Sequence, residues 1–188
     1  GVMAYECSFE VSKGELDDFA ILLKVPVTTL CPCSKEISVR GAHNQRGEVT
    51  IKVRFNDRIW IEELIEIAED SASCSLFPVL KREDEKYVTE KAFDNPRFVE
   101  DLVREVALRL RKDSRIDSFR VEVENYESIH AHNAYAMIEE DKASSFFRQG
   151  VCCPRCHDQT TDQQKASFAE RQKQIELAKQ RDDSHFNE

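Results

Sequence analysis

The chain carries the stretch Val49-Thr-Ile-Lys-Val-Arg-Phe55, in which apolar residues alternate with polar ones. This two-residue period is typical of a β-strand with one apolar face and one wet face. The same alternation runs through Phe119-Arg-Val-Glu-Val-Glu124, and residues 134–138 are expected to supply a returning strand. Because strands with one wet face usually form antiparallel sheets, these stretches predict an antiparallel sheet.

Upstream of this stretch, residues 5–11 alternate in the same way and residues 20–30 are more apolar, which predicts one long, interrupted strand. Apolar residues recur at helical spacing over residues 58–71 and predict an amphipathic helix. A second helix is expected to begin at Asn95, a favourable N-cap, with Pro96 at the first helical position.

The expected order is therefore strand, strand, helix, helix, strand, strand (ββααββ). An α+β fold, with a four-stranded antiparallel sheet and two helices on one face, is the economical packing for these elements. The alternation stops after Lys142, and polar residues dominate from Asp158. We therefore expect one domain over residues 1–142 and a flexible or partly helical tail over residues 143–188.

Charge and composition exclude several classes of protein. The net charge is −9, and residues 1–142 hold 29 acidic against 20 basic residues, which argues against a nucleic-acid partner. No apolar stretch approaches the roughly 20 residues of a membrane span. Seven cysteines without a secretory segment favour reduced thiols in the cytoplasm. Because the chain starts at Gly1, close to strand-like sequence, we expect it to be a piece of a longer protein.

The segment between Cys31 and Arg46 concentrates candidate ligands in a loop between two strands. If Cys31-Pro-Cys33 is extended, its two thiols point to one side, and His43 returns across the loop. Thiolate and imidazole suit zinc or Fe(II). The same residues are equally compatible with a buried structural cysteine and a histidine that only bonds the loop.

A second group of candidate residues is Glu127-Ser-Ile-His-Ala-His132, in which His130 and His132 would share one face of an extended strand end. Two imidazoles and a carboxylate suit proton transfer or metal binding. The acidic run over residues 82–90 is typical of a solvated polar loop. Glu100 lies near the start of the second predicted helix, where the helix dipole favours an acidic residue without any functional role.

Five motifs together are similar to the type IB GTP cyclohydrolase family over residues 3–138. They are Cys31-Pro-Cys-Ser-Lys-Glu-Ile-Ser, Gly41-Ala-His-Asn-Gln-Arg, Asp84-Glu-Lys-Tyr-Val-Thr-Glu, Asn95-Pro-Arg-Phe-Val-Glu-Asp and Glu127-Ser-Ile-His-Ala-His-Asn-Ala-Tyr-Ala. The resemblance implies a tunnelling fold (T-fold) built from ββααββ units. It further implies two units per full chain, of which this chain would be the second, assembled as a homotetramer.

The resemblance also implies an activity and its metal. The family converts GTP and water into 7,8-dihydroneopterin triphosphate and formate, the first step of folate synthesis. By matching motifs, Cys31, His43 and Glu85 would bind one divalent metal ion, which would activate water. The residue types accept Mn, Fe or Zn, so the metal stays undetermined.

The remaining roles follow from the same matches. Cys33 would be the second, essential thiol, and His130 and His132 would shuttle protons. Glu127 would read guanine, because a carboxylate accepts from N1–H and the exocyclic amine together. Glu100 would be a further functional acid without a defined role. Lys35, Arg46 and Arg97 are triphosphate candidates by charge alone.

Two other readings remain open from the sequence. A T-fold remnant could bind a purine or pterin without catalysis, and a structural zinc module would explain the cysteines but not Glu127 or the histidine pair. The tail cluster Cys152-Cys-Pro-Arg-Cys-His157 departs from the family pattern. It formally matches a haem-attachment motif or half of a zinc knuckle, and an incidental extension explains it as well.

Overall fold

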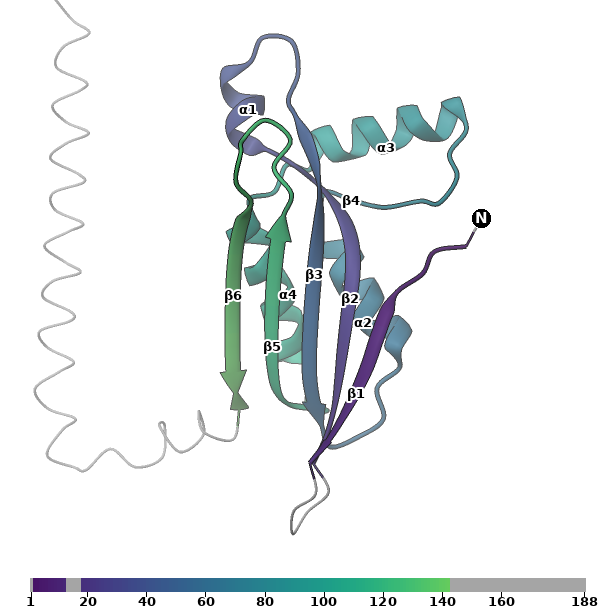
Figure 1. Ribbon diagram of the computed structural model, residues 1–188, viewed down its shortest axis with the longest axis vertical. Coiled ribbons are helices and arrows are strands. Elements are labelled where there is room, and N and C mark those ends of the chain that lie inside the picture. Colours follow the sequence, from purple (N-terminus) through teal and green to yellow (C-terminus); the bar gives the residue numbers. More distant parts are fainter. Residues whose placement is uncertain (1, 13–17, 143–188) are drawn as a thin grey trace, which may run out of the picture. The chain divides into compact units, whose positions relative to one another are not determined.

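The computed structural model describes residues 2–12 and 18–142, and Figure 1 labels their helices and strands. In chain order these are β1 (Glu6–Ser12), β2 (Asp18–Leu30), α1 (Pro32–Ile37), β3 (Asn44–Phe55), α2 (Ile61–Ser71), β4 (Cys74–Ser75), α3 (Arg82–Asp94), α4 (Val99–Lys112), β5 (Ile116–Asn125) and β6 (Ala134–Asp141). The predicted tail, with its cluster of Cys152, Cys153, Cys156 and His157, lies outside the described residues.

The strands form one open antiparallel sheet in the order β1-β2-β3-β5-β6, and the short β4 pairs with β2. This confirms the predicted α+β class and the antiparallel sheet. The expected number of four strands is wrong, because the described part of the chain contributes six to this sheet.

One of the two additional strands comes from the N-terminal segment, and the other is β4. Residues 5–11 and 20–30 were expected to form one interrupted strand, but β1 and β2 pair with each other as antiparallel neighbours, from Glu6 opposite Lys24 to Ser12 opposite Asp18. Each run is long enough to be a strand by itself, so the chain reverses between them. Gly14, between the two runs, is the turn signal that could have revealed the reversal.

The core lies between one face of the sheet and the helices α2 and α4 (Figure 1). Alternate residues of the central strands, such as Val25, Ile51 and Val121, are fully buried on this face. They pack in one cluster with Leu64 of α2 and Leu102 of α4. Each such side chain stabilises the fold by about 1.5–3 kcal/mol when it leaves water. The apolar residues of the strand pattern and of the helix pattern therefore form one core.

The start of α4 differs from the prediction. The helix begins at Val99 after Phe98, and Asn95 instead closes α3 as its C-cap. The Asn95 side chain donates to the carbonyl of Ala72 (2.9 Å) and so ties this junction to the end of α2. Pro96 therefore stands between two helices, where its missing N–H also costs nothing.

Helix α3 occupies the acidic run that was expected to be a polar loop. Its start is stabilised by the Asp84 carboxylate, which accepts from the backbone N–H of Lys81 (3.0 Å). Three acidic residues lie in the first turn, where they suit the helix dipole. Lys86 and Glu90 form an i,i+4 pair further along (3.8 Å). The acidic first turn and the Lys86–Glu90 pair therefore favour a helix, although this run is too polar to be buried.

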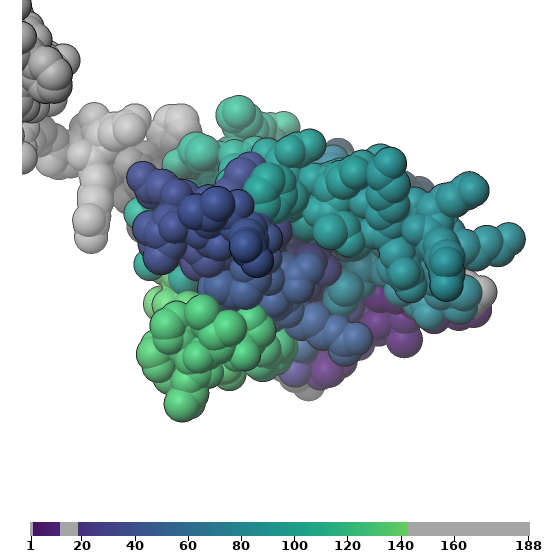
Figure 2. All heavy atoms as spheres, turned by 90° about the horizontal axis from the view of Figure 1, so that it is seen from above, coloured from purple at the N-terminus to yellow at the C-terminus, as the bar shows by residue number. Residues whose placement is uncertain are grey.

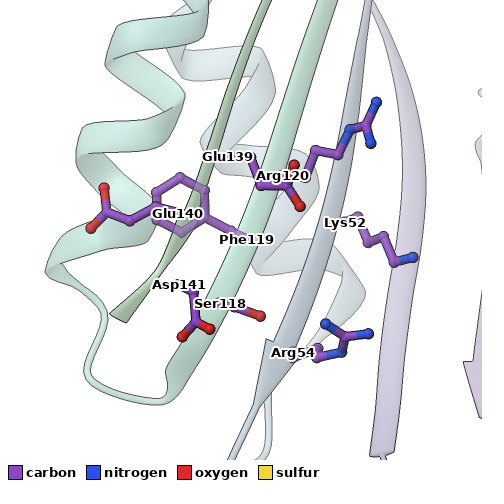
Figure 3. Close-up of a pocket in the computed structure, with 8 residues that line it drawn as sticks. All are labelled: Lys52, Arg54, Ser118, Phe119, Arg120, Glu139, Glu140 and Asp141. Carbon is purple, nitrogen blue, oxygen red and sulfur yellow. The ribbon is translucent and has the colours of Figure 1, made fainter. Parts of the chain in front are cut away.

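The other face of the sheet is charged, and its charges are largely paired. Lys24 bonds to Glu6 and Lys52 to Glu10 (2.6 Å). At the end of this face remote from α1, a hollow of about 250 Å³ contains basic and acidic side chains together (Figure 3). Mixed charge gives this hollow no preference for an anion. No helix within the described ranges is long and apolar enough to span a membrane.

Candidate functional site

The candidate residues meet at one end of the sheet because adjacent antiparallel strands end and begin there. Cys31 directly follows β2 and His43 directly precedes β3, while Glu127, His130 and His132 lie between β5 and β6. Figure 2, which looks onto this end, shows the segment of α1 and the 126–133 loop side by side. Residues almost 100 positions apart thus share one surface.

Hydrogen bonds hold the Cys31 segment against the His43 segment. The Cys31 N–H donates to the His43 carbonyl (3.1 Å). Ser34 ties both segments together, because its hydroxyl donates to the Cys31 carbonyl (3.0 Å) and accepts from the His43 N–H (3.2 Å). The structure therefore brings Cys31 and His43 together, as expected from the sequence.

The expected extended Cys-Pro-Cys geometry is wrong, since α1 begins at Pro32. Proline fits the first turn of a helix, and the Cys31 sulfur accepts from the Ser34 N–H as an N-cap (3.5 Å). Cys31 is partly buried and Cys33, inside the helix, is exposed. The two thiols consequently differ in environment, with Cys33 the more accessible one.

His43, His130 and His132 form a chain of imidazoles. The ring centroids of His43 and His130 are 6.4 Å apart, and those of His130 and His132 are 5.5 Å apart. His130 and His132 do not share the face of a strand as predicted, because residues 126–133 form no strand. Ser128 Oγ lies 3.0 Å from His43 Nδ1, which leaves His43 Nε2 as the nitrogen that can meet a ligand.

The neighbours of Glu127 in the chain, Tyr126 and Ser128, line a hollow of about 630 Å³, a size typical of small-molecule sites. The hollow is lined by Thr28, Asn44, Gln45, Arg46, Leu76, Tyr126 and Ser128. Glu127 accepts a hydrogen bond from Gln45 Nε2 (3.1 Å). Burial, reinforced by the carboxylate of Glu48, raises the pKa of Tyr126, so this phenol stays neutral and offers an aromatic face and a donor.

Of the seven lining residues, Arg46 alone was a candidate from the sequence. Gln45 and Ser128 lie inside quoted motifs, two residues after His43 and one after Glu127, and Tyr126 directly precedes Glu127. Polar residues that flank candidate ligands within such motifs are the signal that could have found them. Their role depends on which partner they face, and spacing alone does not reveal it.

Glu85 is not gathered with Cys31 and His43. The C-terminal end of α3 lies against α1, because Lys35 donates to the Phe93 carbonyl and its Nζ stands 4.4 Å from the Phe93 ring centroid. Glu85 precedes Phe93 by eight residues, about 12 Å along a helix. Across the part of the chain that the structure describes, no group of three His, Cys, Asp or Glu is close enough to hold a metal ion.

The remaining candidates lie around the same end of the sheet. Glu100 is exposed in the first turn of α4, three residues after Arg97, whose N–H donates to the Leu30 carbonyl (3.0 Å). Lys35 is engaged with Phe93. Of the three triphosphate candidates, Arg46 is the one that lines the hollow of about 630 Å³.

Comparison with known proteins matches residues 1–136 to the family model described as type I GTP cyclohydrolase folE2. The chain belongs to this family. It is 59% identical over 143 residues to the GTP cyclohydrolase FolE2 of Nitrosomonas eutropha, covering 75% of this chain and 54% of the relative. It is 59% identical over 148 residues to the FolE2 of Akkermansia muciniphila, covering 77% and 56%. For the FolE2 of Kosmotoga olearia the identity is 57% over 140 residues, covering 74% and 54%.

The chain therefore spans about half the length of the curated FolE2 relatives that it matches. The match includes every candidate residue from Cys31 to His132, since all of them lie within residues 1–136. The family model thus covers the chain from β1 into β6.

Proposed function

We propose that this protein is the part of a FolE2 enzyme that binds GTP and performs its hydrolytic ring opening in the cytoplasm. The products would be 7,8-dihydroneopterin triphosphate and formate, at the start of folate synthesis. The observation that carries the proposal is the gathering of Cys31, His43, Glu127 and His130 at one end of the sheet, beside a hollow of small-molecule size.

Recognition of the base is assigned to Glu127. Its carboxylate accepts from Gln45, which lines the hollow, and could accept from guanine N1–H and the exocyclic amine at once. Adenine has no donor at N1 and presents its amine elsewhere, so it would leave the carboxylate unmatched. Arg46, on the same hollow, is the favoured contact for the triphosphate.

Proton transfer is assigned to His130 and His132. Their ring centroids lie 5.5 Å apart and the row continues to His43, so a proton could pass along adjacent imidazoles. The accessible Cys33 thiol would assist at the reacting carbon. Glu100 would supply an acid from the first turn of α4, at the same end of the sheet.

The proposed metal is a divalent Mn, Fe or Zn ion at Cys31, His43 and Glu85. The donor set suits such an ion, which would supply an activated water. The conformation described here brings two of the three ligands together and holds the third on α3. The roles given above to Glu127, Cys33 and the histidines therefore rest on these side chains alone.

The chain spans about half the length of its FolE2 relatives, and this bears on assembly. We propose a T-fold unit that pairs with a second unit and forms a homotetramer, as the family resemblance implies, without a nucleic-acid or membrane partner. Support comes from the open sheet, whose edge strands β1 and β6 each have a neighbour on one side only. A complete site would then require the other half of the protein.

The proposal is tested by formate and neopterin release from GTP after anaerobic loading with Mn(II), Fe(II) or Zn(II). The chain is assayed alone and joined to the unmatched half of the Nitrosomonas eutropha relative. We expect turnover in the joined protein and its loss in Cys33→Ala, with retained activity in the control Cys7→Ala on β1. GTP binding without formate release by a metal-loaded, correctly assembled joined protein would instead establish a non-catalytic purine- or pterin-binding protein.

A further inference from the structure

The pairing of β3 with β5 continues past the end of β5 into the loop that follows. The ladder itself ends at Asn125, the last residue of β5. Beyond it, the Tyr126 N–H still donates to the Arg46 carbonyl (2.8 Å). One position further, Gln45 Nε2 donates to Glu127 Oε1 (3.1 Å). The first residues of the loop therefore keep the register of the sheet and stay beside the start of β3.

Ser128 is the next residue of this loop, and the register brings it to His43. Its Oγ lies 3.0 Å from His43 Nδ1, a hydrogen-bond distance. The main chain of the same histidine is held from the other side, because its N–H donates to Ser34 Oγ (3.2 Å) and its carbonyl accepts from the Cys31 N–H (3.1 Å). The Cys31 segment thus holds the backbone of His43, and the loop after β5 holds its ring.

This contact decides which ring nitrogen of His43 can bind a metal ion. A zinc-bound imidazole nitrogen lies about 2.0–2.1 Å from the ion, and the Ser128 oxygen stands where an ion would approach Nδ1. Nε2 is the nitrogen that remains. When a neutral imidazole gives the Nε2 lone pair to an ion, its proton lies on Nδ1, and the Ser128 hydroxyl has the lone pairs to accept it.

We infer that Ser128 is a positioning residue that holds the His43 ring with Nε2 turned toward the metal ion. It acts through the orientation and the tautomer of the ring and does not touch the ion. Metal-bound histidines almost always donate their second N–H to such a partner, and its loss typically weakens metal binding roughly 10–100-fold. This inference rests on the proposed metal ligands Cys31 and His43, and it is independent of how the base is recognised.

The position of Ser128 also ties the metal ligand to the proposed proton-transfer groups. The loop that orients His43 carries His130, whose ring centroid lies 6.4 Å from that of His43. A displacement of this loop would therefore turn the ligand and move the neighbouring imidazole together. One short segment after β5 sets the geometry of both.

The first test measures the affinity for Zn(II) by competition with a chromogenic chelator, under reducing conditions. The whole chain is used, with the tail cysteines of residues 152–156 replaced by serine so that these thiols do not compete for zinc. We expect Ser128→Ala to weaken binding about tenfold and Ser128→Thr, which keeps the hydroxyl, to restore it. The matched control is Ser38→Ala, because the Ser38 hydroxyl accepts only from the Arg40 N–H among its described contacts (3.3 Å) and should leave the affinity unchanged.

A second readout follows the ring proton directly. In the zinc-loaded protein with ¹⁵N-labelled histidine, we expect a slowly exchanging Nδ1–H signal that disappears in His43→Gln and so belongs to this ring. In Ser128→Ala the same proton should exchange faster with water, because its acceptor is absent. A role of Ser128 in loop structure alone would not change which nitrogen carries the proton or restore its protection in Ser128→Thr.

The outcomes separate the inference from the proposed metal site. If His43→Gln loses zinc affinity and Ser128→Ala keeps it, the positioning role is refuted and the metal site stands. A loss that Ser128→Thr does not restore, or that Ser38→Ala shares, also refutes it, since the hydroxyl is then not the cause. Unchanged affinity in His43→Gln overturns both the ligand and its positioning residue. Ser128 is exposed, so its variants should fold, and thermal melts check this.

Discussion

Gly47 is expected to resist substitution because the space for a side chain is already filled. A Cβ at this position would stand 2.7 Å from Asn125 Oδ1 and 3.4 Å from Val27 Cγ2. The first distance is shorter than carbon and oxygen tolerate without a bond. Backbone conformation is not the reason, since Gly41, at +131°, is the only described glycine with a positive φ.

The cost of Gly47→Ala follows from this crowding. Inserting a methyl group into a packed site destabilises by about 1–3 kcal/mol, while Ala in place of Gly recovers about 0.4–1 kcal/mol of chain entropy. We therefore expect a net loss of about 1–2 kcal/mol. When Asn125 is first replaced by Ala, the obstructing oxygen is absent, and Gly47→Ala should become neutral or slightly stabilising. The coupling between the two changes should be about 2 kcal/mol.

Urea denaturation followed by far-UV circular dichroism measures all four proteins of this cycle. The matched control is Gly41→Ala, which has open space around its Cβ but a left-handed backbone. Its cost should be the same with and without the Asn125 side chain, because the strain is local. An equal cost of Gly47→Ala in both backgrounds would refute the steric explanation.

Two further predictions concern stability. Leu102→Ala, at a fully buried position of α4, should cost about 2–5 kcal/mol in urea denaturation, and a cost below 1 kcal/mol would contradict the core assignment. Hydrogen bonds from Arg115 hold the pKa values of Glu63 and Asp113 below their usual 4.5 and 3.8. Because the unfolded chain binds these protons more readily, the stabilisation is complete above pH 4.5 and is lost as pH falls through the lowered values. Arg115→Gln should therefore flatten the decline of the melting temperature in acid, and an unchanged decline would refute the assignment.

The central sheet could be predicted from the sequence because its information is local. Alternation over residues 49–55 and 119–124 specifies which face of each strand is buried, and the structure buries Val49, Ile51 and Val53. The hairpin of β1 and β2 was missed because periodicity reports the faces of a strand and does not report where the chain reverses. Helix α3 was missed for the opposite reason, since a polar helix has almost no apolar period to detect.

The candidate site could be predicted in part. Cys31 and His43 meet because they flank the adjacent ends of paired strands, which loop position already suggested. Glu85 and the extended Cys-Pro-Cys geometry depended on how α3 and α1 are placed, and a family motif carries no such placement. Gln45 and Ser128 act by turning another side chain, so their chemistry becomes visible only when the partner atom is known.

The site depends on strand register as much as on its residues. A slip of one residue between β3 and β5 would place Asn44 or Arg46 opposite Glu127 in place of Gln45, because successive side chains of a strand point to opposite faces. If β3 were the strand that slipped, Val49 and Ile51 would turn from the core to water. Each of these is fully buried, so the slip would cost several kcal/mol. The apolar alternation that specifies the sheet therefore also keeps the Gln45 amide facing the Glu127 carboxylate, so one determinant sets both the core and this contact.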